Sequence, residues 1–346
     1  MRLIACLVSL LALCACSRSN GERPKTGRGD ELETLELRYQ GFASLVTYPE
    51  LAEDLGYLAP LKLKWIGNTI SGPQDIQTVV TGDTDFGGAF NGAIVKLVAA
   101  KAPIKAVIGY YGVDDGTWAG FFVNEGSEIK SARDLIGKKV AMNTLGAHHE
   151  FMLREYLARA GLGPDEIKQV TLIVVPPLSG EQALRQHQVD VTALSGIFRD
   201  KALERGGIRP LFTDLELFGK FTAGSYVFSD SSLREHPNAV RKFVGAVARA
   251  IEWARTEPRD AVQQRMADII RKRGRGEDAS LVAYWRSTGI AQPGGRIAER
   301  EFRVWLDWLE RDGVLARGRL TPAAIYTNQF NPYPEPQSKP EEHASQ

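Results

Sequence analysis

The sequence predicts an α/β fold in which one pattern of alternating strands and helices occurs twice. Segments of strand length, either apolar or alternating in polarity, are separated by segments of helix length, and this order favours parallel strands with helices on both faces of a sheet. Roughly 300 residues lie between two polar ends of the 346-residue chain, which is enough for two lobes. No close sequence repeat joins the two halves, so the prediction concerns similar architecture and not duplication.

The first series opens with an alternating strand and closes with an apolar strand suited to the centre of a sheet. It comprises strands at 35–39, 61–66 and 104–111, a loop at 40–44, and helices at 48–56 and 93–100.

Residues 71–91 are the most informative part of that series. Ser71 and Gln74 fit a capping box, and Gly82 is placed to end the helix that follows. A glycine-rich run at 87–88 then allows backbone to approach a ligand closely. The helix start beside such a run could hold a polar or anionic small molecule, although an ordinary strand–helix–strand connection has the same pattern.

The second series repeats the alternation, and a mainly helical remainder follows it. It comprises strands at 119–123, 138–142, 170–175 and 189–194, a helical turn at 131–136, a helix from 148 to 160 and a helix at 180–186. In the remainder, two helices carry apolar stripes that we assign to the core and not to a ligand: Val240, Phe243, Val244, Val247 and Ile251, then Phe302, Trp305, Leu306 and Leu309.

Composition excludes several classes of function. The formal net charge of +1 gives no electrostatic case for nucleic-acid binding, and we interpret the basic run 271–275 as a solvated helix end. All three cysteines lie within residues 1–16, so a processed chain would have neither a disulfide nor a thiol nucleophile. No nucleophile–base arrangement, phosphate loop or metal-ligand cluster is recognisable, and we predict no enzyme activity, no cofactor and no metal site.

The N-terminus predicts export. Arg2 precedes an apolar run at 3–15 that is too short to span a bilayer as a mature helix. It ends in Leu-Cys-Ala-Cys, which resembles the lipobox of bacterial lipoproteins and implies lipidation of Cys16 after removal of the signal peptide 1–16. A plain signal peptide and a retained anchor are the alternatives. Residues 17–33 are predicted to be a flexible tether and 333–346 a disordered tail.

Five further segments together resemble one protein family. They are Ser71–Gln74, Thr84–Gly87, Ala132–Ala141, Gly180–Leu184 with Val189–Val191, and Pro237–Val240. In this order they are similar to the solute-binding proteins of ABC importers for alkanesulfonates, taurine, nitrate and thiamine precursors.

The resemblance implies a periplasmic-binding-protein type II fold, with a ligand cleft between two lobes. Each lobe would be a mainly parallel sheet flanked by helices. We expect lobe I at 34–113, lobe II at 114–226 and a return to lobe I at 227–332, with crossovers near 112–119 and 225–229.

The same resemblance implies most of the expected ligand contacts. Carried over by motif are Gln40, Gly41, Phe42, Ser71, Gly72, Gln74, Phe90, Asn91, Gly146, Ala147, His148 and His149. From the residues themselves, Tyr111 and Trp118 beside the first crossover could stack on a ligand or pack at the hinge. Ser195 and Gly196 follow a strand, so their amides are expected to face the cleft. Ala147 replaces the small hydroxyl residue common in relatives, which puts a simple alkanesulfonate in doubt.

Two pairs of polar residues remain ambiguous. His148 and His149 point in different directions from a helix start and make a poor metal site, so they either bond a ligand or serve as surface or capping groups. Asp114 and Asp115 either meet a cationic ligand or belong to a solvated loop.

The predicted function is therefore a lipid-anchored, monomeric solute-binding protein. It would face the periplasm or cell exterior, capture a small organic or oxyanionic solute, and deliver it to the permease and ATPase subunits of an ABC importer. Two alternatives stay open: an enzyme on the same fold resembling thiamine-pyrimidine synthase, and a sensor subunit that presents ligand to a receptor.

Overall fold

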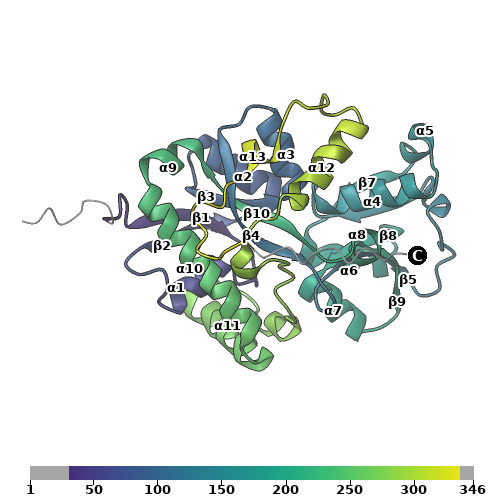
Figure 1. The fold of residues 1–346 in the computed structure, drawn as a ribbon. Coiled ribbons are helices and arrows are strands. Elements are labelled where there is room, and N and C mark those ends of the chain that lie inside the picture. The colour runs from purple at the N-terminus through teal and green to yellow at the C-terminus, as the bar shows by residue number, and fades with distance from the viewer. Residues whose placement is uncertain (1–30, 336–346) are drawn as a thin grey trace, which may run out of the picture. The chain divides into compact units, whose positions relative to one another are not determined.

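The strands of the chain divide between two lobes, each built around its own sheets (Figure 1). The structure, a computed structural model, describes residues 31–335. The predicted signal peptide, the lipidation site Cys16, the tether up to residue 30 and the tail from residue 336 lie outside the described residues.

Lobe I contains two sheets. β1 (Glu36–Gly41) pairs in parallel with β2 (Lys62–Asn68), and β10 (Phe221–Ser229) lies between β3 (Phe86–Phe90) and β4 (Ile104–Val113). β10 runs antiparallel to both of its neighbours, so β3 and β4 point the same way. Their carboxyl ends therefore meet at one edge of the sheet.

Lobe II contains one five-stranded sheet, whose strands are β5 (Ala119–Asn124), β6 (Lys139–Met142), β7 (Thr171–Val174), β8 (Val191–Ser195) and β9 (Ile208–Thr213). Their order in the sheet is β7-β6-β8-β5-β9. β6, β7 and β8 are mutually parallel, while β5 is antiparallel to β8 and β9, so four strands run one way and only β5 opposes them. In both lobes the strand that opposes the others follows a crossover.

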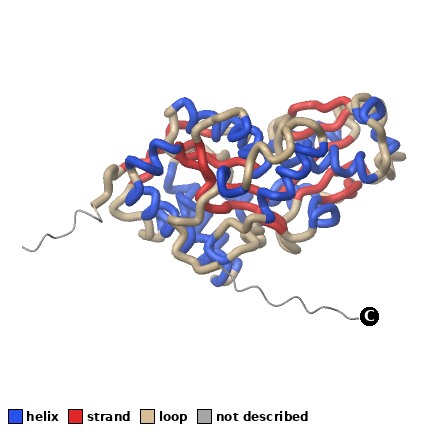
Figure 2. The backbone as a smooth tube through the Cα atoms, turned by 45° about the horizontal axis from the view of Figure 1, so that its top comes forward, coloured by secondary structure: helices blue, strands red, loops and turns tan. Residues whose placement is uncertain are grey.

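Helices cover both faces of the strands in lobe I (Figures 1 and 2). In lobe I they are α1 (Tyr48–Asp54), α2 (Gly72–Thr81), α3 (Asn91–Ala99), α9 (Asp230–Glu235), α10 (Pro237–Thr256), α11 (Arg259–Arg273), α12 (Arg300–Arg311) and α13 (Pro322–Ile325), with short 3₁₀ turns η3 (Ala279–Tyr284) and η4 (Pro293–Gly295). In lobe II they are α4 (His148–Arg159), α5 (Pro164–Ile167), α6 (Gly180–Arg185), α7 (Gly196–Glu204) and α8 (Asp214–Phe218), with η1 (Arg133–Leu135) and η2 (Pro177–Ser179).

Side chains alternate between the two faces of each sheet, as expected for strands with helices on both sides. On β5, Phe121 and Val123 enter one hydrophobic cluster, whereas Phe122 between them enters another. On β10, Val227 and Phe228 divide in the same way. The predicted α/β class with helices on both faces is therefore confirmed.

The two apolar stripes predicted in the C-terminal part lie in the core. The five stripe residues of α10 are at most 1% exposed and the four of α12 at most 2%. Among the described residues no helix combines the length and the apolar character that a membrane crossing requires.

The capping-box prediction for α2 is wrong. Ser71 is the N-cap residue, yet its side chain makes no capping hydrogen bond and Gln74 is exposed. The Ser71 hydroxyl instead donates to Thr144 Oγ1 of lobe II at 3.1 Å. The helix end was predicted correctly, because Gly82 has a left-handed φ of 80°.

The glycine run of β3 also differs from its prediction. A Cβ on Gly87 would lie 2.6 Å from the backbone oxygen of Asp75, and one on Gly88 would lie 2.8 Å from the Tyr110 ring. The missing side chain at Gly87 lets helix α2 pack against the strand, and the missing side chain at Gly88 makes room for the Tyr110 ring. Both glycines are therefore required for packing and not for the approach of a ligand to the backbone.

Three segment boundaries are corrected. The chain leaves lobe I at 114–118 and returns at 219–220, not near 225–229, because β10 pairs with β4 from Phe221 onward. The carboxylate of Glu33 accepts hydrogen bonds from the backbone N–H groups at the start of α10, so the tether ends before it. Tyr333 packs against Gly294, so the ordered fold extends past 332.

Candidate functional site

Two adjoining cavities lie between the lobes and share part of their lining. The main cavity has a volume of about 330 Å³ and the side cavity about 290 Å³. Both are lined by residues of lobe I and lobe II, and six residues line both: Phe42, Tyr110, Tyr111, Asn143, His149 and Ser195. A pocket between two lobes at the carboxyl ends of strands is where this class of fold is expected to hold a ligand.

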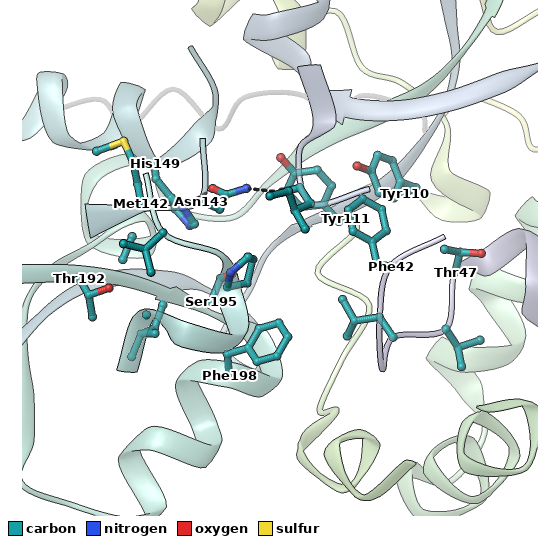
Figure 3. A pocket seen from close by; sticks show the side chains of 18 of the residues that line it. Phe42, Thr47, Tyr110, Tyr111, Met142, Asn143, His149, Thr192, Ser195 and Phe198 are labelled. Atoms are coloured by element: carbon teal, nitrogen blue, oxygen red, sulfur yellow. Dashed lines mark hydrogen bonds between the residues drawn. The ribbon is translucent and has the colours of Figure 1, made fainter. Parts of the chain in front are cut away.

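The walls of the main cavity are apolar and aromatic. In Figure 3, Phe42, Tyr110 and Tyr111 of lobe I lie on one side of the main cavity, and Met142 and Phe198 of lobe II lie on the other. Among the described residues that line the main cavity there is no Lys, Arg, Asp or Glu. The cavity thus offers a ligand contact area and neutral hydrogen-bonding groups, but no cationic side chain.

Hydrogen bonds join the two walls. Asn143, which follows β6, donates from Nδ2 to the backbone oxygen of Ile70 in lobe I at 3.2 Å (Figure 3). Asn143 Oδ1 lies 3.0 Å from Nδ1 of His149 on α4. The Asn143–Ile70 and Ser71–Thr144 bonds hold the two lobes together beside the cavities.

The side cavity contains a buried acid and a buried histidine. His148 Nε2 lies 3.4 Å from Asp214 Oδ2, and the His148 ring stacks on Phe90 with ring centroids 4.9 Å apart. Burial, aided by the neighbouring His149, lowers the pKa of His148 to about 3, while burial raises the pKa of Asp214 to about 7. Because His148 is neutral at physiological pH, the pair is not a doubly charged ion pair.

One tyrosine that lines the main cavity and one buried acid close to that tyrosine have unsatisfied polar atoms. The hydroxyl of Tyr226, a lining residue, is buried without a partner among the described residues, as is Oδ1 of Asp75. The other carboxylate oxygen of Asp75 accepts from the Gly88 N–H at 2.7 Å, and burial raises the pKa of Asp75 to about 7. Tyr226 stacks on Tyr110 at 4.2 Å, which fixes the ring beside the cavity.

Ten of the sixteen predicted contact residues line one or both cavities. They come from the ends of strands and the first turns of helices in both lobes, and lie together as one group: Phe42, Gly72, Phe90, Tyr111, Trp118, Ala147, His148, His149, Ser195 and Gly196. Trp118 also carries the Arg199 guanidinium over its ring at 4.0 Å, so it has a packing role as well as an exposed edge.

The other six predicted contacts lie outside the cavity linings, and their side chains have other surroundings. Asn91 is fully buried and bonds Thr222, Ser225 and the Glu301 backbone. The remaining five are Gln40, Gly41, Ser71, Gln74 and Gly146.

The two aspartates of the first crossover, Asp114 and Asp115, bond to other residues of the two crossovers. Asp114 Oδ1 accepts from the backbone N–H groups of Gly116 and Thr117, both at 2.8 Å. Asp115 pairs with Lys220 of the second crossover.

Several lining residues were missed by the sequence reasoning. The most consequential are Asn143 after β6, Val175 after β7 and Phe198 on α7. The predicted ends of the strands at 142 and 175 were correct to within one residue. Extending the rule that ligands gather at the carboxyl ends of parallel strands to every such strand could have found the first two.

The sequence profile of the NMT1/THI5-like family matches residues 51–261, well over half of the chain. A putative aliphatic sulfonates-binding protein of Escherichia coli K12 is 30% identical over 175 residues, covering 49% of this chain and 52% of the relative. The chain thus matches about half the length of that curated relative.

Solved structures show the same fold. The alkanesulfonate-binding protein SsuA from Xanthomonas axonopodis pv. citri, bound to MOPS, aligns with a TM-score of 0.66 at 21% identity over 86% of this chain and all of that one. The periplasmic nitrate-binding protein NrtA from Synechocystis PCC 6803 gives 0.66 at 15% identity over 86% and 88%. These likenesses confirm the two-lobed periplasmic-binding-protein fold. The family profile and the Escherichia coli relative confirm the predicted resemblance to binding proteins of the alkanesulfonate type. The chain belongs to the NMT1/THI5-like family.

Proposed function

We propose that this protein is the solute-binding protein of an ABC importer. The observation that carries the proposal is the pair of cavities between two lobes, each lined from both sides. A solute held there contacts both walls at once, so its binding favours the closed arrangement of the lobes. A membrane permease would read that closed arrangement. The similarity to sulfonate-binding relatives supports the same role.

The proposal places the protein outside the cytoplasm, anchored by a lipid on Cys16. The apolar run and the lipobox-like residues at its end support this part of the proposal. Mass spectrometry of the protein from a bacterial membrane fraction should find a diacylglyceryl-modified N-terminal cysteine. Cys16→Ser should abolish the lipid and release the protein from the membrane; an unmodified N-terminus in the native chain would contradict the anchor.

Solute binding itself is tested by a thermal-shift screen. The full chain is heated with each member of a panel of sulfonates, nitrate, pyrimidines and aromatic acids. A solute at about a hundred times its dissociation constant should stabilise the protein by about 2.7 kcal/mol. A panel without a single stabilising solute would contradict binding of these classes.

A pair of variants locates the binding site. Phe198 lines the main cavity and is half-buried, so Phe198→Glu brings a carboxylate to the cavity without replacing a core residue. Val304 on α12 is 42% exposed and serves as the control in Val304→Glu. We expect the first variant to lose the shift and the second to keep it. Equal shifts in both variants would place the solute elsewhere.

The proposal includes no chemical step. The solute recovered from the protein after incubation should be chemically unchanged, which mass spectrometry of the released ligand checks.

A further inference from the structure

The direction of the hydrogen bonds beside the main cavity determines what His149 presents to a ligand. The chain of bonds starts at the backbone oxygen of Ile70, a group that can only accept. The Asn143 atom that faces it, at 3.2 Å, must therefore be the amide nitrogen. Its amide oxygen then faces Nδ1 of His149 at 3.0 Å, and because that oxygen can only accept, Nδ1 carries the proton.

The other nitrogen of His149 is consequently a hydrogen-bond acceptor. In a neutral imidazole with its proton on Nδ1, Nε2 has a bare lone pair. Among the described residues no group bonds His149 Nε2, and none forms an ion pair with the ring. The ring neighbours are His148, with centroids 6.0 Å apart, and Phe121 at 6.3 Å. Burial lowers the pKa of His149 to about 4, in agreement with a neutral ring.

The chain of bonds exists only while the lobes are together. Ile70 belongs to lobe I, whereas Asn143 and His149 belong to lobe II. Separation of the lobes would free the Asn143 amide from the Ile70 carbonyl, and nothing would then fix the tautomer of His149. The closed arrangement that holds a ligand is thus the one in which Nε2 is an acceptor.

Such an acceptor is unsuited to a sulfonate. Sulfonate oxygens only accept hydrogen bonds and carry a negative charge, while the main cavity has no cationic side chain among its described lining residues. Burying a charge that has no opposite charge beside it is costly. The aromatic and aliphatic walls, in contrast, suit a flat apolar body in a cavity of about 330 Å³.

We propose that the main cavity binds an uncharged, ring-containing molecule that donates an O–H or N–H group to Nε2 of His149. This inference rests on the proposed function, since it assigns the chemical class of the solute. The proposal predicts one measurable difference from proteins that bind small anions. This chain should prefer solutes that donate a hydrogen bond over anionic solutes that only accept one.

Three probes with one ring system test the preference by calorimetry at pH 7.5 with the full chain. They are 2-naphthol, which donates; 2-methoxynaphthalene, which has the same body without a donor; and naphthalene-2-sulfonate. We expect the sulfonate to bind at least about tenfold more weakly than the naphthol, a difference of about 1.4 kcal/mol. The methoxy compound should bind about two- to tenfold more weakly, the value of one neutral hydrogen bond. Equal or tighter binding of the sulfonate, equal binding of the methoxy compound, or no binding of either uncharged naphthalene would overturn the proposal.

A variant and a spectrum assign the preference to His149. His149→Phe should bind naphthol and methoxynaphthalene equally, whereas His187→Asn, which removes a histidine from an exposed turn outside both cavities, should keep the difference. Should His149→Phe fail to fold, ¹⁵N-histidine NMR of the unaltered protein saturated with naphthol decides the question. A His149 ring with its proton on Nδ1 supports the proposal, and one with its proton on Nε2 overturns it.

The outcomes distinguish this inference from the proposed function. If a solute loses its binding in Phe198→Glu, but compounds with and without a hydrogen-bond donor bind equally well, only the proposed chemical class of the solute is refuted. A screen without any cavity-dependent solute refutes the binding function.

Discussion

Removal of the Tyr226 hydroxyl should stabilise the protein without solute. The side chain is 3% exposed, and its hydroxyl has no partner among the described residues. Tyr226→Phe keeps the ring, which stacks on Tyr110 and contacts Phe86 edge-on at 5.6 Å, so packing is retained. A buried polar group without a hydrogen bond costs about 1–3 kcal/mol. We therefore expect the variant to gain at least about 1 kcal/mol in free energy of unfolding.

Tyr39→Phe is the matched control, with the opposite sign. Tyr39 is also 3% exposed, but its hydroxyl donates to Glu50 Oε1 at 2.7 Å and accepts from Arg275 Nη2 at 2.9 Å. Hydrogen bonds to charged groups contribute about 1.5–3 kcal/mol, so this variant should lose that amount. The two variants should then differ by at least about 2.5 kcal/mol.

Urea denaturation of the solute-free chain measures both variants, with an unchanged m-value as the check that only stability has changed. If Tyr226→Phe is as destabilised as Tyr39→Phe, the Tyr226 hydroxyl has a partner, such as a buried water shared with Asp75 Oδ1, and the reasoning fails. A gain in stability together with weaker solute binding would show that the hydroxyl is kept for the ligand.

Three further predictions concern packing and protonation. Asp75 keeps its proton up to about pH 7 in the folded state, against a usual value of 3.8, so its contribution to stability is complete below pH 3.8 and is lost as the pH rises toward 7. Asp75→Asn should lessen this fall in a pH series of urea denaturations and leave the part due to Asp214 and Glu301, whose pKa values burial also raises to about 7. An unchanged pH dependence would show that the Asp75 carboxyl is ionised. Gly112→Ala should lower the free energy of unfolding by about 3 kcal/mol or more, because the new Cβ would lie 2.3 Å from the backbone oxygens of Gly289 and Phe221. An unchanged denaturation midpoint would mean that strands β4 and β10 can shift apart at little cost. Phe151→Ala should lower the free energy of unfolding by about 3–5 kcal/mol, because this side chain of lobe II is 1% exposed and packs in the core of lobe I. A loss below about 1 kcal/mol would show that packing between the lobes does not depend on Phe151.

The parts of the fold that were predicted are those set by local periodicity. The stripe of α10, from Val240 to Ile251, follows helical spacing and is buried as expected. The place of Gly82 follows from backbone conformation alone. Features decided by contact between distant segments were not predictable in this way: Ser71 has the composition of a cap, but a hydroxyl from the other lobe, on Thr144, is its partner.

The sequence predicted which residues lie near the cavities better than it predicted where their side chains point. A motif match identifies a residue near the cleft but not where its side chain points, and Asn91 accordingly turned out to bond within the core. Asn143 has no distinctive local pattern, because its role comes from meeting Ile70 across the cleft. The histidines were recognised as ambiguous. The chain of hydrogen bonds through Asn143 makes His149 an acceptor, whereas Nε2 of its neighbour His148 faces Asp214.

Lobe II is one uninterrupted stretch of chain between the two crossovers, and this has a consequence for how such proteins diversify. Exchange of a single gene segment covering residues 119–218 would replace one entire wall of the main cavity and leave the other wall in place. A lineage could thereby change its solute in one recombination event instead of through many separate substitutions. The incoming segment would have to bring an aromatic side chain that fits the socket of Phe151 in lobe I, so that socket sets which exchanges give a folded chimera.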